Sequence, residues 1–227
     1  MHNSILNKWL NTNQTCPLCD SAQGTSIGPC DACREDLPYQ QLGCDICALP
    51  GVSGRCNSCQ NQRPAYTRIH AGFTYHFPLP QLLHRIKTGG DPEPLYWLAQ
   101  LLARKLADKL PKDSQLIPVP MYPVDQLIRG FNQSELLARH LAKALNLPTP
   151  INLINKRKRT AHQASLNRAQ RRRNLHQCFS LSRTPPERLI LVDDVVTTGT
   201  TVGRITELLL QEGAREVSVC TLCRTPD

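Results

Sequence analysis

The feature that most constrains the fold of this chain is a series of four Cys-x-x-Cys pairs within its first 59 residues, separated by ten, ten and eight residues. The pairs are Cys16/Cys19, Cys30/Cys33, Cys44/Cys47 and Cys56/Cys59. A two-residue spacer lets both thiolates of a tight turn point at one ion, and two such turns complete a tetrahedral shell that suits zinc. Eight ligands therefore predict two zinc ions per chain.

A disulfide scaffold is the competing interpretation of these cysteines, but it requires an oxidising compartment. The first residues, MHNSILNKWLN, lack the positive-then-apolar layout of a signal peptide. We therefore favour zinc, in a structural role, because a shell of four thiolates leaves no open coordination position for water. Sequential pairing of the knuckles is the simplest arrangement, and a cross-braced arrangement is the alternative.

The net charge of the chain changes from slightly acidic to strongly basic near Pro64. Residues 1–64 carry four Lys or Arg and five acidic residues, whereas residues 65–227 carry 23 basic and 13 acidic residues, so the net charges are −1 and +10. This shift predicts two domains, a double zinc-binding module over 1–64 with four cysteines per ion and a basic domain over 65–227.

The overall composition is that of a folded protein, with 40% hydrophobic and 20% charged residues. No run approaches the roughly 18 apolar residues that a membrane-spanning helix needs. We therefore expect a cytoplasmic protein without a transmembrane segment.

Within the second domain, strand-like and helix-like patterns alternate. Strands are expected at 68–77, 116–119, 189–192 and 217–222, and helices at 79–86, 95–106, 132–145 and 202–209. Strands that alternate with helices predict an α/β fold with a parallel, doubly wound sheet. Cys220 and Cys223 fall within the last strand, where we expect them to pack in the core rather than bind metal.

The most informative stretch follows the strand at 189–192. Asp193 and Asp194 come directly after buried-type residues, and the turn Thr197–Thr201 then opens a helix. A helix amino end at the carboxyl edge of a parallel sheet offers free N–H groups to a phosphate, and Gly199 lets the backbone approach closely. The carboxylates would repel phosphate, so they suit vicinal ribose hydroxyls with a divalent cation nearby. Together they indicate a site for a ribose 5-phosphate.

This stretch resembles the phosphoribosyl-diphosphate motif of type I phosphoribosyltransferases: an apolar strand, an acidic pair, two residues and Thr-Thr-Gly-Thr-Thr. The chain order of zinc knuckles, Pro118-Val-Pro120, Arg129-Gly-Phe-Asn-Gln133 and this motif resembles the ComF competence family over nearly the whole chain. The resemblance implies a small zinc-binding module joined to a type I phosphoribosyltransferase-like α/β domain, with a role in the uptake or utilisation of external DNA.

Position by position, the resemblance implies that Asp193 and Asp194 hold the ribose hydroxyls of phosphoribosyl diphosphate, with Mg²⁺ bound beside them. It implies that the loop Met121–Gly130 binds diphosphate, with Arg129 as a candidate contact; a helix-capping or packing role for the segment around Arg129 is the alternative. It further implies that the cradle for the 5-phosphate consists of Thr197, Thr198, Gly199, Thr200 and Thr201.

A strongly basic segment lies between the Arg129–Gln133 motif and the phosphoribosyl-diphosphate motif, with eight positive charges and no acidic residue over 156–173. Its charges are Lys156, Arg157, Lys158, Arg159, Arg168, Arg171, Arg172 and Arg173. Three interpretations stay open: neutralisation of diphosphate, binding of nucleic-acid backbone without sequence preference, or a solvated surface. Under the second, the partner is DNA, single-stranded in the first instance and bound with low specificity.

The leading functional hypothesis is a ComF-type protein that handles imported DNA, with a phosphoribosyl-diphosphate pocket and a basic DNA-binding surface. DNA-translocation machinery at the inner membrane is then an expected partner. The alternatives are an active nucleotide-salvage phosphoribosyltransferase and a non-catalytic sensor of phosphoribosyl diphosphate. No nucleobase pocket or general base can be identified in the sequence, so enzymatic turnover stays open.

Overall fold

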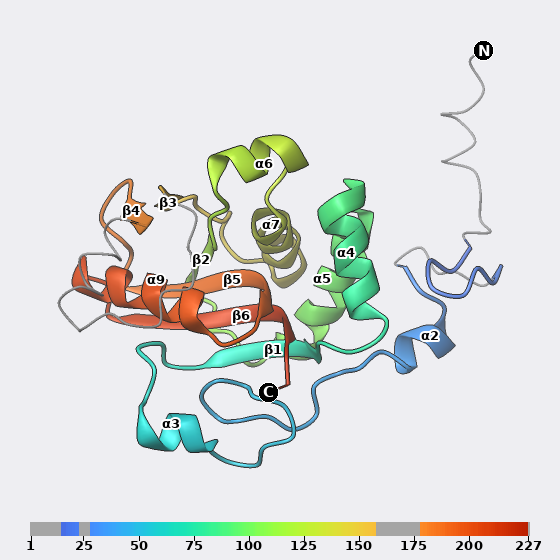
Figure 1. Cartoon of the computed structure of the whole chain (residues 1–227), viewed down its shortest axis with the longest axis horizontal. Helices are drawn as coiled ribbons and strands as arrows, with labels where there is room; N and C mark the ends of the chain where they lie inside the picture. Colours follow the sequence, from blue (N-terminus) through green and yellow to red (C-terminus); the bar gives the residue numbers. More distant parts are fainter. Residues whose placement is uncertain (1–14, 23–27, 158–177, 227) are drawn as a thin grey trace. The chain divides into compact units, whose positions relative to one another are not determined.

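The structure, a computed structural model, describes residues 15–22, 28–157 and 178–226 (Figure 1). The chain forms two compact units, Met1–Pro38 and Tyr39–Asp227. The first four cysteines belong to the smaller unit and the second four to the larger one. This division by compactness falls between Pro38 and Tyr39, and the composition-based boundary at residue 64 stays a prediction.

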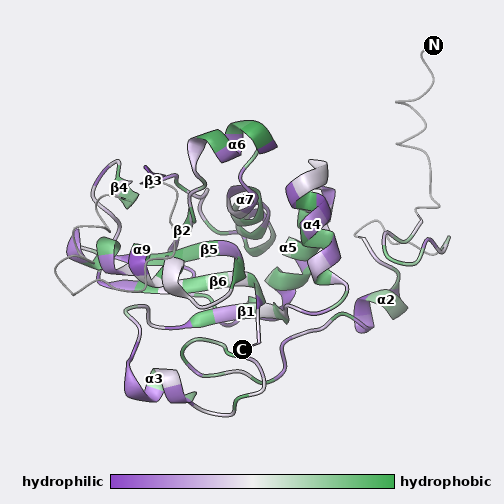
Figure 2. Ribbon diagram, in the orientation of Figure 1, coloured by the Kyte–Doolittle hydropathy of each residue, from purple (hydrophilic) through white to green (hydrophobic). Residues whose placement is uncertain are grey.

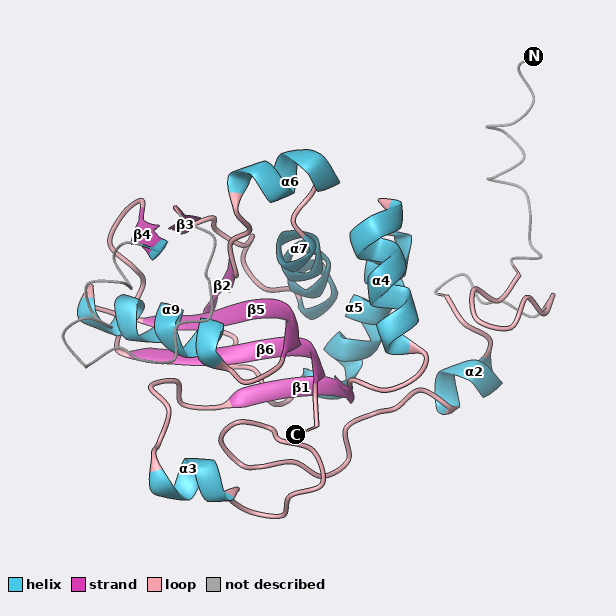
Figure 3. Ribbon diagram, viewed as in Figure 1, coloured by secondary structure: helices cyan, strands magenta, loops and turns pink. Residues whose placement is uncertain are grey.

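The larger unit is built on a parallel sheet with the strand order β1-β6-β5-β2 (Figure 3). The pairs β1/β6, β6/β5 and β5/β2 are all parallel, which confirms the predicted α/β fold. Two further strands, β3 and β4, pair antiparallel to each other. The strands are β1 (Ile69–Thr74), β2 (Gln115–Pro118), β3 (Ile154–Lys156), β4 (Phe179–Leu181), β5 (Arg188–Val196) and β6 (Glu216–Arg224).

Helices connect the parallel strands, as crossovers between parallel neighbours require. Each of the helices predicted from 3.6-residue periodicity is present, with bounds that differ by a few residues. In the part of the chain that the structure describes, none of the helices combines the length and the apolar character needed to cross a bilayer. The helices are α2 (Asp31–Glu35), α3 (Asn57–Asn61), α4 (Leu79–Gly89), α5 (Glu93–Leu106), α6 (Pro123–Arg129), α7 (Gln133–Leu145) and α9 (Thr200–Gln211).

Hydrophobic residues lie on both faces of the sheet, because successive side chains of a strand point to opposite sides. On one face, Leu189 and Leu191 of β5 share a core with Val202 and Ile205 of α9 and with the second group of cysteines. The helices α5 and α7 pack against each other, and α7 also lies against β2 and β5. The strands of the sheet are correspondingly apolar along most of their length (Figure 2). The site-bearing end of β5 is thus held from both sides.

Two parts of the larger unit differ from the expectation. The segment Met121–Gly130, expected as a loop, contains the helix α6, which runs from Pro123 to Arg129 and is followed by Gly130 in a left-handed conformation. Its Leu127 and Ile128 are exposed, so α6 lacks the apolar face from which helices are predicted. The strands β3 and β4 come before and after the basic segment in the sequence, and with three residues each they are too short to show a pattern.

Candidate functional site: two cysteine clusters and the carboxyl end of β5

The eight amino-terminal cysteines form two groups, and within each group the four sulfur atoms lie within 4.8 Å of one another. The groups follow chain order, so the structure has the sequential pairing and not the cross-braced alternative. None of these eight cysteines forms a disulfide bond. The first group is Cys16, Cys19, Cys30 and Cys33, and the second is Cys44, Cys47, Cys56 and Cys59.

The geometry of both groups fits a tetrahedral zinc ion. A Zn–S bond of about 2.3 Å gives sulfur–sulfur edges of about 3.8 Å in a tetrahedron, and the structure has 3.8 Å between Cys19 and Cys30 and 3.6 Å between Cys47 and Cys56. In each group the backbone N–H of the third cysteine points at the sulfur of the first, at 3.4 Å for Cys30 and 3.3 Å for Cys56. Both groups are therefore suited to hold structural zinc.

The predicted phosphate turn lies where β5 gives way to α9. Gly199 adopts φ +74° and directly precedes α9, so the turn needs the left-handed conformation that glycine supplies most easily. Across the turn, the hydroxyls of Thr198 and Thr200 lie 2.8 Å apart. The turn and Asp193 together line a small cavity of about 40 Å³. The structure thus brings the predicted acidic residue and the predicted phosphate cradle to one hollow.

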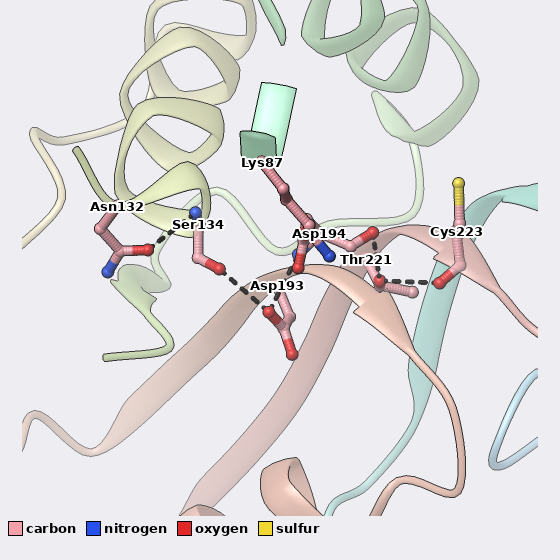
Figure 4. Close-up of polar contacts among 7 residues, drawn as sticks. All are labelled: Lys87, Asn132, Ser134, Asp193, Asp194, Thr221 and Cys223. Atoms are coloured by element: carbon pink, nitrogen blue, oxygen red, sulfur yellow. Dashed lines mark hydrogen bonds and ion pairs between the residues drawn. The ribbon is translucent and has the colours of Figure 1, made fainter. Parts of the chain in front are cut away.

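The acidic pair is held by groups from three other elements (Figure 4). The hydroxyl of Ser134 in α7 donates to Oδ1 of Asp193 at 2.9 Å. Nζ of Lys87, in the last turn of α4, lies 2.7 Å from Oδ2 of Asp194, and Thr221 of β6 donates to the carbonyl oxygen of Asp194 at 3.3 Å. The pair is therefore a fixed feature of the fold.

The two carboxylates differ in their surroundings. Asp194 is buried and faces the ammonium of Lys87, whereas Asp193 keeps part of its surface at the cavity. Burial, and next the negative charge of Asp194, raise the pKa of Asp193, and the hydrogen bond from Ser134 offsets only part of this. A cation or hydroxyl donors that approach Asp193 would therefore stabilise its ionised form.

Sequence reasoning missed Lys87 and Ser134, because their roles depend on contacts with a distant strand. A local signal exists for Ser134, which lies in the capping sequence Asn132–Glu135. Asn132 caps α7 by accepting from the N–H of Ser134 at 3.0 Å, and it also donates to the carbonyl of Val119. Glu135 instead accepts from Arg139, so the reciprocal half of the capping box does not form.

Of the remaining predicted site residues, those that the structure describes do not line the small cavity. Arg129 ends α6 and is half-buried; within the described ranges no hydrogen bond or ion pair joins it to the acidic pair. Of the basic segment, Lys156 ends β3, and the N–H of Arg157 donates to the carbonyl of Cys178. The other predicted DNA contacts lie outside the described residues, namely Lys158, Arg159, Arg168, Arg171, Arg172 and Arg173. Cys220 and Cys223 are fully buried in β6, as expected for core residues.

A larger cavity, of about 560 Å³, lies at the opposite end of the sheet. Its lining includes Gln115, Arg188 and Glu216, which are the first residues of β2, β5 and β6. Ligands of parallel α/β sheets bind at the carboxyl ends of the strands. We therefore assign the candidate ligand site to the smaller hollow beside Asp193, despite its size.

Comparison with known proteins gives concordant results. Residues 132–227 match the phosphoribosyl transferase domain family. Competence protein F of Haemophilus influenzae is 33% identical over 215 residues, covering 87% of this chain and 90% of that protein. DNA utilization protein YhgH of Escherichia coli O157:H7 is 35% identical over 207 residues (87% and 91%), and competence protein ComFC of Streptococcus pneumoniae is 30% identical over 203 residues (86% and 87%).

Proposed function

The chain belongs to the ComF family of competence and DNA utilization proteins, and from this premise we propose that it serves in the uptake or utilisation of external DNA. Its relatives carry the names competence protein F, DNA utilization protein and competence protein ComFC, and this chain covers 87–91% of their lengths. We place this role in the cytoplasm, beside the DNA-translocation machinery of the inner membrane.

The proposed ligand of the larger unit is phosphoribosyl diphosphate with Mg²⁺. The observation that carries this proposal is the juxtaposition of Asp193 with the turn Thr197–Thr201 around one hollow at the end of β5. Backbone N–H groups at the amino end of α9 and the threonine hydroxyls would receive the 5-phosphate. Asp193 and Asp194 would accept hydrogen bonds from the ribose hydroxyls, and Mg²⁺ would neutralise the diphosphate oxygens.

Lys87 adds a cation that the sequence did not suggest. Its ammonium lies 2.7 Å from Asp194, so it stabilises the buried carboxylate and also places positive charge beside the ribose position. Arg129, on α6, is the second candidate for diphosphate. We propose that Lys87 is the closer of the two, because it already contacts the acidic pair.

Thermal stability with and without Mg²⁺-phosphoribosyl diphosphate tests this site. A ligand at about 100 times its Kd should stabilise the folded protein by about 2.7 kcal/mol. The variant Asp193→Ala/Asp194→Ala should lose this gain. The matched control Asp113→Ala/Glu187→Ala removes two exposed carboxylates at the opposite end of the sheet and should keep it. If the ligand does not raise the melting temperature of the native protein, the hollow beside Asp193 is not a site for phosphoribosyl diphosphate.

We propose that the basic segment binds DNA backbone. Its eight charges and no acid favour phosphate contacts, and the segment leaves β3 and returns to β4, with Arg157 and Cys178 hydrogen-bonded at its base. Gel shifts over a salt series should show weaker binding, with a shallower salt slope, for Arg171→Gln/Arg172→Gln/Arg173→Gln. The triple variant of Arg34, Arg55 and Arg63 to Gln has the same net charge and should bind like the native protein. Equal binding by both triples would reject the segment as the DNA surface.

Turnover separates the remaining alternatives. An active nucleotide-salvage phosphoribosyltransferase should release diphosphate when a nucleobase is added to phosphoribosyl diphosphate. A sensor should bind the ligand, change its affinity for DNA and release nothing. We favour binding without turnover, because the basic charge of the domain suits a binding role and no general base is identified.

A further inference from the structure

A buried arginine connects the second cysteine cluster with the phosphate turn. Arg224, the last residue of β6, is 4% exposed. Its Nε donates to the carbonyl of Cys47 at 3.0 Å, and its Nη1 donates to the carbonyls of Thr197 and, at 3.5 Å, of Val196. One guanidinium thus bridges a metal-ligand residue and the first residue of the turn.

The partners of Arg224 explain why it is placed there. A buried guanidinium is costly unless its donors are satisfied, and in the described part of the chain no carboxylate forms an ion pair with it. Backbone carbonyls do this instead, including that of Thr225 at 2.7 Å. One of these carbonyls belongs to the knuckle of Cys47 and another to the turn that begins at Thr197. Arg224 therefore fixes the position of the knuckle relative to the turn.

Tyr66 makes a second connection on the same side of the sheet. It is 4% exposed and belongs to the same core cluster as the second four cysteines. Its hydroxyl oxygen lies 3.1 Å from the position that a Cβ on Gly199 would occupy. The ring therefore fills the space between the cluster and the back of the turn.

We propose that the second cluster, when it holds its metal, positions the phosphate turn through Arg224 and Tyr66, so that metal occupancy controls sugar-phosphate binding. The bound metal would fix the knuckle that contains Cys47. It would therefore also fix the carbonyl of Cys47, which accepts a hydrogen bond from Arg224. Loss of the metal would let that carbonyl move and would loosen the packing of Tyr66 against the turn. The ligand half of this proposal rests on the proposed function, whereas the coupling of cluster to turn does not.

The first test measures hydrogen exchange of the turn without any ligand. In Cys59→Ser, which breaks the second cluster, the amides of 197–201 should exchange about tenfold faster than in the native protein. The matched control Cys33→Ser breaks the first cluster and should leave them unchanged. Unchanged exchange in Cys59→Ser, with zinc loss confirmed by metal analysis, would overturn the coupling.

The second test keeps all eight cysteines and therefore decides the case even if Cys59→Ser unfolds. Arg224→Lys retains the charge but cannot bridge both carbonyls as the guanidinium fork does, and Tyr66→Phe removes only a hydroxyl. Both should speed exchange of the turn severalfold while two zinc ions stay bound. Thr206→Val, which removes a buried hydroxyl of α9 bonded to Val202, controls for general loss of stability and should leave the turn unchanged. Normal exchange in both test variants would contradict the proposal.

The third test uses linkage in the native protein. If metal and ligand are coupled, each must affect the other equally. Mg²⁺-phosphoribosyl diphosphate should therefore tighten zinc binding by the second cluster about fivefold or more, measured by equilibrium competition with a zinc-selective chromogenic chelator, and this tightening should vanish in Arg224→Lys. Ligand that binds in the thermal assay without tightening zinc binding would overturn the control of binding by metal. Ligand that fails to bind at all, beside coupled exchange in the first two tests, would reject the proposed function and retain the coupling.

Discussion

The two cysteine clusters share their spacing and sulfur geometry but differ in their surroundings. In the first cluster Cys19 is exposed and Cys33 half-buried, and α2, the helix that contains Cys33, has no buried residue. All four cysteines of the second cluster are buried. They share a core with Ile69 of β1 and with Val202 of α9.

This difference shows that one local motif can serve two purposes. A segment with few apolar residues depends on a bound metal to fold, and we expect this dependence for the small unit that contains the first cluster. The second cluster also contributes buried sulfur and backbone contacts to the α/β domain, including the carbonyl of Cys47 that receives Arg224. Its metal is therefore expected to stabilise the whole larger unit.

The largest expected effect comes from breaking each cluster in turn. Cys47→Ser should lower the free energy of unfolding of the larger unit by about 4 kcal/mol or more, because structural zinc contributes about 10–16 kcal/mol in small domains. Cys19→Ser should lower it by less than about 1 kcal/mol. Thermal denaturation followed by circular dichroism, with zinc counted for each variant, checks both. Equal losses would erase the distinction between the clusters.

An intermediate effect is expected at the contact between Tyr66 and the turn. Gly199→Ala adds a Cβ at φ +74° and 3.1 Å from the Tyr66 hydroxyl, so it should cost about 2–3 kcal/mol. Gly90→Ala has a similar φ of +65° but open space around it, and should cost only about 1 kcal/mol. Denaturant unfolding measures both. A Gly199 cost no greater than that of Gly90 would mean that the wall behind the turn is not rigid.

A smaller effect is expected in the pH dependence of stability. The pKa of Asp193 is raised in the folded protein by burial and by Asp194, so the folded state binds a proton that the unfolded state releases. The contribution of this acidic pair to the free energy of unfolding should therefore decrease as pH rises above about 4, the ordinary aspartate pKa. Asp193→Asn retains the acceptor for Ser134 and should stabilise the domain by about 1 kcal/mol more at pH 8 than at pH 5.

Urea unfolding at the two pH values measures this difference, and the same measurement extends the comparison of clusters. The pH effect should persist when Cys19→Ser is added and should diminish with Cys47→Ser, because the second cluster shares the core of the unit in which β5 buries the pair. A larger gain from Asp193→Asn at pH 5 than at pH 8 would show that the sign of the shift is wrong.

The smallest effect is expected on the surface of the first cluster's unit. Arg34 and Asp31 form an exposed ion pair at 2.6 Å on α2, and such pairs contribute about 0–1 kcal/mol. Asp31→Ala should therefore leave zinc affinity of the first cluster within about twofold of the native value. Competition with a chromogenic chelator measures it. A tenfold loss would show that surface charge, and not the metal alone, holds this unit.

Features with local causes were predictable from the sequence. The four Cys-x-x-Cys pairs predicted both clusters, whereas the sequential grouping was the simpler of two arrangements that the spacing left open. The apolar run before Asp193 and the Thr/Gly turn after it predicted β5 and α9, since both elements follow from residues within one window. The parallel sheet then followed from the alternation of strands and helices.

Features with long-range causes were not predictable. Arg224 and Cys47 are 177 residues apart, and nothing local distinguishes Arg224 from a surface arginine at the end of a strand. Lys87 likewise meets Asp194 only because α4 ends near the carboxyl edge of β5. The helix α6 does carry a start signal at Pro123 and a stop signal at Gly130, but its exposed Leu127 and Ile128 obscure the amphipathic pattern.

The most direct test of the account is a crystal structure of the protein with Mg²⁺ and phosphoribosyl diphosphate. The account predicts density for the 5-phosphate against the amides of Thr197–Thr201 and for the ribose hydroxyls within hydrogen-bonding distance of Asp193 and Asp194. Density for the ligand at the opposite end of the sheet, or none beside the turn at saturating ligand, would contradict it.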